Sequence, residues 1–242
     1  GGGPMKIGPS ITDIMGGTAA VGAILAALYH RDAGGGPGQY IDVALYESTF
    51  RLLDELAPAF AKFGVVRQRM GADTATIVPH SHYQCSDGQW VAIACSSDKI
   101  FEKLAQAMGR ADLVASGTYE TMQARVDNRD FINGIVGEWI GRHTRDELMA
   151  VCLANEIPCG PVNSIADIFA DPHFKARGSL LSVQHPEVGE IVVPAVLPRL
   201  SKTPGRVTHL GRRHGADTGD VYGELLGLTA QKLAELKSRG IV

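Results

Sequence analysis

The stretch Ser10–His30, SITDIMGGTAAVGAILAALYH, constrains this chain more than any other part of its sequence. Small and aliphatic residues dominate it, so it predicts a long helix over about 13–31 that is built for burial. Residues 14–30 carry no formal charge, and this uncharged run is almost long enough to span a membrane. Gly16, Gly17, Thr18 and Gly22 dilute the hydrophobicity, which favours the core helix of a soluble protein.

One acidic side chain, Asp13, stands at the front of this helix, and the next carboxylate is Asp32. Unpaired N–H groups and the helix dipole stabilise an ionised carboxylate at a helix start, so Thr12 or Asp13 is a candidate N-cap residue. Gly16 and Gly17 leave space for another backbone or a ligand, at a cost of about 1 kcal/mol each relative to alanine. A carboxylate in such a niche can also act as a nucleophile on an activated acyl group. The residues alone leave both roles open.

Composition narrows the function classes. The net charge of −3 and the pI near 6.2 give no general attraction to nucleic acid or to anionic membranes. Four cysteines, with neither CxxC spacing nor the density of a disulfide scaffold, indicate free thiols of a cytoplasmic protein.

His80 and His82 lack a cysteine or carboxylate at ligand spacing, so no metal is expected. GGGPGQ, residues 34–39, leaves a helix and enters a strand, the reverse order of a phosphate-binding loop.

The order of expected elements is that of an α/β protein. In residues 1–65 the opening helix leads through a Gly-Pro-Gly turn to a strand at 40–45 and a second helix at 47–63. That second helix begins at Glu47. Like Asp13, the Glu47 carboxylate is a candidate either for capping its helix or for catalysis. One edge of a layered α/β domain has this order of elements.

Residues 66–195 have a mixed pattern. Asp87–Gly88 predicts the turn of a β-hairpin, because such a turn needs positive φ. An amphipathic helix is expected to start at Ser97 or Asp98 and to end at Gly109, and a capping box of Thr144 and Glu147 predicts another. Further expected elements are a helix at 128–142, a short extended piece and helix within 157–174, strands at 178–184 and 190–197, and terminal helices near 220–226 and 229–238.

The segment GPMKIGPSITDIMGGTAAVGAILAALYHRDAGGGPGQYIDVALYESTF resembles the family III CoA-transferases, the CaiB/BaiF group. In that family a helix headed by an aspartate is followed by ILAAL, a short basic turn, G-x-GQ and IDVAL. The similarity continues through DGQWVAIACSSDKIFEKLAQAMGR, NEIPCGPVNSIADIFADPHFKARG and LGLTAQKLAELKSRGIV. It therefore covers nearly all of the chain in the family's order.

This resemblance implies a fold and an assembly. Family members are similar in having a large Rossmann-like domain, built from both ends of the chain, with a smaller α+β domain inserted. Residues 1–65 would belong to the large domain, 66–195 to the small domain, and 196–242 to a return segment whose helices pack on the large domain. Two subunits are expected to interlock as a homodimer.

The resemblance also implies a chemistry. Asp13 would be the nucleophile that attacks an acyl-CoA thioester, forming a mixed anhydride and then an aspartyl-CoA thioester. A small carboxylic acid would then accept the CoA, which is a substrate, and no metal would take part. Gly16 and Gly17 would make room for the thioester and CoA. Gly88 and Gln89 are candidates for small-domain residues that close over the site.

The chain departs from the family at its start. Family members carry a long segment before this aspartate, which supplies most of their CoA-binding basic residues, whereas twelve residues precede Asp13 here. We therefore expect a C-terminal portion that binds CoA weakly by itself and takes its other half from the same protein or in trans.

Two alternatives to the transferase stay open. One is a 2-methylacyl-CoA racemase of the same fold, which would pair Asp13 with a histidine of the missing part. The other is a non-catalytic fragment or assembly partner in which Asp13 only caps its helix. IDVALYESTF and PCGPVN resemble the transferase branch more, in particular enzymes that use succinyl-CoA and a dicarboxylic acid.

Overall fold

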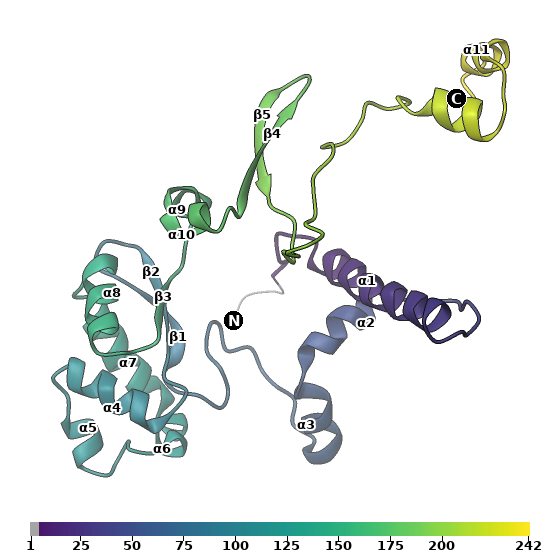
Figure 1. Cartoon of the computed structure of the whole chain (residues 1–242). Helices are drawn as coiled ribbons and strands as arrows, with labels where there is room; N and C mark the ends of the chain where they lie inside the picture. Colours follow the sequence, from purple (N-terminus) through teal and green to yellow (C-terminus); the bar gives the residue numbers. More distant parts are fainter. Residues whose placement is uncertain (1–4) are drawn as a thin grey trace. The chain divides into compact units, whose positions relative to one another are not determined.

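The computed structural model describes residues 5–242, which divide into two compact units, Gly1–Gly71 and Ala72–Val242 (Figure 1). The regular structure of the first unit is helical over its described residues, whereas the second unit combines helices with two small antiparallel sheets. The chain is thus a mixed helix and sheet protein. The division into 1–65, 66–195 and 196–242 stays a prediction.

The first unit consists of three α-helices and one turn of 3-10 helix. These are α1 (Ile11–Asp32), α2 (Leu45–Phe50), η1 (Arg51–Leu53) and α3 (Leu56–Phe63). Helix α1 confirms the long opening helix, and α2 packs against it. Gly16 is the buried residue of α1, at the point where the two helices touch.

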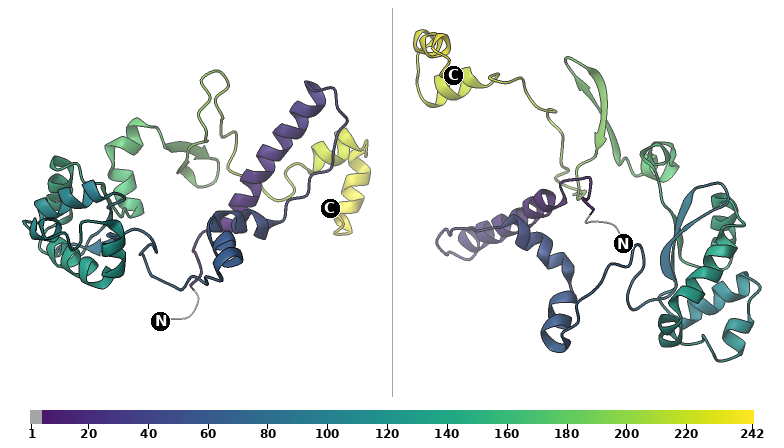
Figure 2. Two further views of the ribbon diagram at one scale, coloured as in Figure 1. Left: turned by 90° about the horizontal axis from the view of Figure 1, so that it is seen from below. Right: turned by 180° about the vertical axis from the view of Figure 1, so that it is seen from behind.

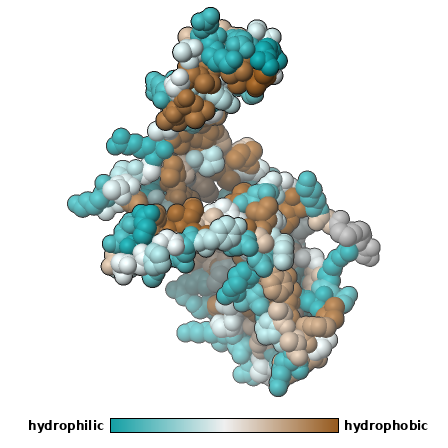
Figure 3. Space-filling model, turned by 90° about the vertical axis from the view of Figure 1, so that its right-hand side faces the viewer, coloured by the Kyte–Doolittle hydropathy of each residue, from teal (hydrophilic) through white to brown (hydrophobic). Residues whose placement is uncertain are grey.

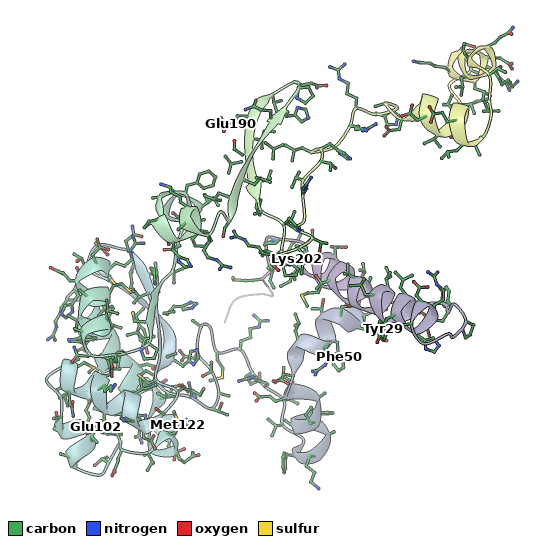
Figure 4. All side chains as sticks on the ribbon, viewed as in Figure 1. Tyr29, Phe50, Glu102, Met122, Glu190 and Lys202 are labelled. Atoms are coloured by element: carbon green, nitrogen blue, oxygen red, sulfur yellow. The ribbon has the colours of Figure 1, made fainter. Side chains whose placement is uncertain are left out.

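The expected burial of α1 is wrong within the described part of the unit. Its apolar side chains Ile14, Val21, Leu25 and Tyr29 are more than half exposed. Figure 4 labels Tyr29 on α1, and Figure 3 colours hydrophobic residues at the surface brown. An apolar helix is buried only where other elements supply a matching face, and α2 covers a small part of α1. By length and composition α1 also passes as a membrane span, a test that the core helix of a soluble protein passes equally.

Two other expectations for this unit are wrong. Residues 40–45 form no strand: residues 35–44 are irregular and α2 already begins at Leu45. A strand needs a neighbour for its N–H and C=O groups, and residues 5–71 provide none. The expected helix at 47–63 is interrupted, because Asp54 has a φ of 43° and a helix requires negative φ.

A three-stranded antiparallel sheet with helices on one face forms the core of the second unit. The strands are β1 (His80–Gln84), β2 (Trp90–Ala94) and β3 (Cys159–Pro161), in the order β1-β2-β3. Ser81, Tyr83, Val91 and Ile93 alternate with more exposed residues and face the core. The covering helices are α4 (Asp98–Ala107), α5 (Asp112–Ala115), α6 (Met122–Asp127), α7 (Arg129–Ile140) and α8 (Arg145–Ala154), which lie on the same side in both views of Figure 2.

Local sequence signals explain these helices. The Ser97 hydroxyl caps α4, and Gly109 follows it with a φ of 70°. Thr144 and Glu147 form the expected capping box of α8. The expected hairpin and the helix at 128–142 are confirmed by β1–β2 and α7. The short helices α5 and α6 were not expected, since four to six residues carry too little periodicity to be recognised.

The rest of the second unit consists of short local elements. Helix α9 (Ile165–Ala170) starts with a capping box of Ser164 and Asp167, and α10 (Pro172–Ala176) begins with proline at its first position. Strands β4 (Leu180–His185) and β5 (Gly189–Pro194) confirm the expected strands at 178–184 and 190–197, and they pair as an antiparallel hairpin. The segment after it ends in the π-helix η2 (Gly219–Leu225) and in α11 (Ala230–Ser238), as expected.

A buried arginine joins the helices to the sheet. The side chain of Arg125, on α6, is fully buried. Its Nε donates to the Val78 carbonyl at 2.8 Å, and its Nη1 donates to the Tyr119 and Glu120 carbonyls at 3.0 and 2.8 Å. Its Nη2 donates to Asp98 Oδ1 at 2.8 Å, and its guanidinium lies 4.4 Å from the centroid of the Phe101 ring. Each guanidinium nitrogen of the buried Arg125 side chain thus has an acceptor, and Asp98 supplies the counter-charge from the edge of the core.

We predict that Arg125→Ala lowers the free energy of unfolding by about 3 kcal/mol or more, because the buried Val78 carbonyl and the part-buried Tyr119 and Glu120 carbonyls lose their donor and the core loses a large side chain. Asp98→Asn is the matched comparison: it removes the counter-charge of Arg125 but leaves an acceptor oxygen and all three carbonyl partners, so its loss should be smaller than that of Arg125→Ala. Urea unfolding followed by circular dichroism measures both. Equal losses in the two variants would contradict this account of Arg125.

Candidate functional site

The first turn of α1 presents a carboxylate that does not cap the helix. The N-cap residue is Ser10, so Asp13 is the third helical residue, and the expectation of Thr12 or Asp13 as N-cap is wrong. Neither half of a capping box forms, since the Ser10 side chain accepts no hydrogen bond from the helix. Asp13 is exposed, and within residues 5–242 its carboxylate makes no hydrogen bond or ion pair. Among the described residues the Asp13 carboxylate is therefore exposed and unpaired.

The two glycines after Asp13 have different surroundings. A Cβ added at Gly16 would lie 2.6 Å from Leu45 Cδ2, so the missing side chain lets α2 approach α1. A Cβ at Gly17 would meet nothing within 4 Å among the described atoms, and Gly17 is exposed. Packing therefore explains Gly16, whereas open space lies beside Gly17, one helical turn from Asp13.

Gly88 and Gln89 lie in the second unit, on the turn between β1 and β2. Gly88 has a φ of 78°, which suits glycine in this turn. Asp87 Oδ1 accepts from the Gln89 N–H at 3.1 Å, and Asp87 Oδ2 accepts from the Arg145 N–H at 3.0 Å. The Arg145 backbone hydrogen bond is the main reason that the pKa of Asp87 is lowered. The turn is thus held against the start of α8.

Arg145 extends this arrangement and was not singled out from the sequence. Its Nη1 donates to Gln89 Oε1 at 3.5 Å, and its Nη2 donates to Asp167 Oδ1 at 3.4 Å. The pKa of Asp167 is lowered first by the Ser164 hydroxyl and its backbone N–H, and then by Arg145. The one sequence signal was the place of Arg145 directly after the cap Thr144. Asp13 and Gln89 belong to different units, so their combination into one site stays a prediction.

No group of three or more His, Cys, Asp or Glu side chains is arranged to hold a metal ion in the part of the chain that the structure describes. His80 and His82 lie on the outer face of the sheet, beside a cavity floored by small residues such as Ala92 and Gly160.

Comparison with known proteins identifies the family. The model of CoA-transferase family III matches residues 1–218, and the chain therefore belongs to that family. The resemblance found in the sequence is confirmed.

Two curated relatives and one solved structure show the extent of the similarity. The succinyl-CoA–L-malate CoA-transferase alpha subunit of Chloroflexus aurantiacus is 48% identical over 97% of this chain, and the beta subunit is 40% identical over 96%. The crystal structure of a CAIB/BAIF family protein from Brucella suis matches 92% of the chain with a TM-score of 0.74 and 32% identity. This chain spans 57% and 58% of the two subunits and 57% of the solved chain, so it corresponds to little more than half of each.

We predict opposite consequences for the two glycines of α1. Gly17→Ala should raise the free energy of unfolding by about 0.5–1 kcal/mol, because alanine favours the helix and nothing obstructs its Cβ. Gly16→Ala should gain less or lose stability, because Leu45 must move. Thermal unfolding followed by the circular dichroism of the helices compares the midpoint temperatures of the two variants. A larger increase in stability for Gly16→Ala than for Gly17→Ala would show that the packing of Leu45 against α1 does not depend on glycine at position 16.

Proposed function

We propose that this chain is part of a CoA-transferase that moves CoA from an acyl-CoA thioester to a small carboxylic acid, with Asp13 as the nucleophile. The observation that carries the proposal is the unpaired, exposed carboxylate of Asp13 on the first turn of α1, in a chain that belongs to CoA-transferase family III. The names of the two similar subunits, both succinyl-CoA–L-malate CoA-transferases, favour succinyl-CoA as donor and a dicarboxylic acid as acceptor.

The proposed reaction begins with attack by a carboxylate oxygen of Asp13 on the thioester carbonyl. The C–S bond breaks, and a mixed anhydride and CoA thiolate form. The thiolate then attacks the Asp13 carbonyl, which releases the first acid and leaves an aspartyl-CoA thioester. The acceptor carboxylate repeats the two steps in reverse, and Asp13 is regenerated. The covalent route divides one difficult transfer into easier ones.

The surroundings of Asp13 support this role. The partial positive charge at the start of α1 stabilises the ionised form that must attack. Open space beside Gly17 would admit the thioester, and Gly16 would contribute indirectly by holding α2 against α1. Gly88 and Gln89 would come from the small domain to cover the bound CoA. Binding energy from the remote CoA body can then be used at the reacting carbonyl.

The proposal includes the expected assembly. Residues 1–65 and 196–242 would contribute to a Rossmann-like domain and residues 66–195 to the inserted domain. The exposed apolar side chains of α1 indicate a face that needs a covering layer. The other half of the family's chain would supply it, within an interlocked homodimer or in trans, in a cytoplasmic enzyme.

We predict that Asp13→Ala lowers turnover of the complete enzyme by about three orders of magnitude or more, as loss of a covalent nucleophile does. Asp32→Asn is the control at the other end of α1; its exposed pair with Arg31 contributes little, so activity should survive. Hydroxylamine added during turnover should convert the adduct to a hydroxamate. Tryptic peptide 7–31 contains Asp13 as its single Asp or Glu, so mass spectrometry assigns the site.

Retained activity in Asp13→Ala would support the non-catalytic alternative. An unmodified peptide 7–31, despite full turnover, would rule out the covalent route.

A second prediction separates the transferase from the racemase. The complete enzyme should move CoA between succinate and a second dicarboxylic acid, measured by chromatography of the acyl-CoA products. A racemase would instead exchange the proton at C2 of its substrate with deuterated solvent, because it works by proton transfer. Deuterium incorporation without CoA transfer would overturn the proposed function in favour of the racemase.

A further inference from the structure

The four cysteines of the chain all lie in the second unit, and two of them, Cys152 and Cys159, lie on elements that contact each other. Cys85 and Cys95 follow β1 and β2, Cys152 lies on α8, and Cys159 begins β3. Cys159 stands opposite Ile93 in the β2–β3 ladder, and Ile93 is buried. Residues directly opposite one another share a face of the sheet, so the Cys159 side chain points to the core. None of these cysteines belongs to the proposed site of CoA transfer.

Helix α8 brings Cys152 to the same place. The turn from α8 to β3 is closed by a 2.8 Å hydrogen bond from the Ile157 N–H to the Cys152 carbonyl. Cys152 belongs to the buried core, and Cys159 packs against that core. Helix α8 contacts β3, and the two side chains are close enough that each thiol shifts the pKa of the other. They are therefore close neighbours on adjoining elements.

We propose that Cys152 and Cys159 form a redox-active thiol pair, which a peroxide oxidises to a reversible intramolecular disulfide. The thiolate attacks one peroxide oxygen, the O–O bond breaks, and a sulfenic acid forms as water leaves. The second thiol attacks the sulfenic sulfur, the S–O bond breaks, and a second water leaves. Two thiols are oxidised and one peroxide is reduced.

The environment of the pair distinguishes it from the other two cysteines. Cys159 is partly exposed, so a small oxidant reaches the pair from the surface. The neighbouring Cys159 thiol lowers the pKa of Cys152, and the Cys152 thiol in turn raises the pKa of Cys159, so Cys152 is the thiol that ionises first. Burial raises the pKa of Cys95 to about 12 and also raises that of Cys85. Those two thiols are therefore the slower ones to react.

Peptide mapping of the full chain tests the proposal. The protein is treated with one equivalent of hydrogen peroxide, blocked with iodoacetamide and digested with trypsin without reduction. Peptide 146–175 contains both Cys152 and Cys159, and peptide 70–99 contains both Cys85 and Cys95. The oxidation of each pair of cysteines is therefore measured on its own peptide. We expect peptide 146–175 to lose two hydrogens and both alkylation sites, and to regain them with dithiothreitol. Peptide 70–99 should keep both labels.

Variants complete the test. Cys85→Ser should form the disulfide like the unaltered protein. Cys159→Ser should form none and should leave a sulfenic acid on Cys152, which dimedone traps. Equal oxidation of the two peptides, unchanged labelling of 146–175, or a link between the two peptides would each overturn the proposal. The result for the unaltered protein stands even if a variant folds poorly.

Discussion

The buried guanidinium of Arg125 is the interaction on which the second unit depends. It joins Val78 before β1, the loop before α6 and Asp98 at the start of α4, segments that lie far apart in the sequence. Three carbonyl oxygens and one carboxylate compensate the charge, so an ion in the core is tolerated. The sheet held in this way positions the β1–β2 turn and also the strand that brings Cys159 to Cys152.

The first unit depends on a different constraint, the apolar character of α1. Its helix forms because small and aliphatic residues favour it, but α2 alone leaves most of its apolar side chains exposed. The same helix presents Asp13 without a partner among residues 5–242. An uncovered apolar helix and an unpaired carboxylate both fit a surface that the remainder of a family III CoA-transferase would complete. Packing and proposed chemistry thus meet on one helix.

Elements with local signals were predictable from the sequence. The hairpin at Asp87–Gly88, the helix capped by Ser97 and the capping box at Thr144 each rest on residues within one turn of one another. The expected strand at 40–45 failed because a strand is stable only beside another strand. The cap expected at Thr12 or Asp13 failed because the helix begins earlier, at Ile11, with Ser10 before it.

Local patterns and the order of motifs were enough to predict the family, the opening helix, the first hairpin and Asp13 as the residue of interest. Only the folded chain shows that Gly16 serves helix packing, that Arg145 holds the β1–β2 turn, and that Cys152 and Cys159 lie on elements in contact. The physical reason is that contacts between distant segments depend on the path of the backbone. Spacing along the chain does not reveal which side chains that path brings together.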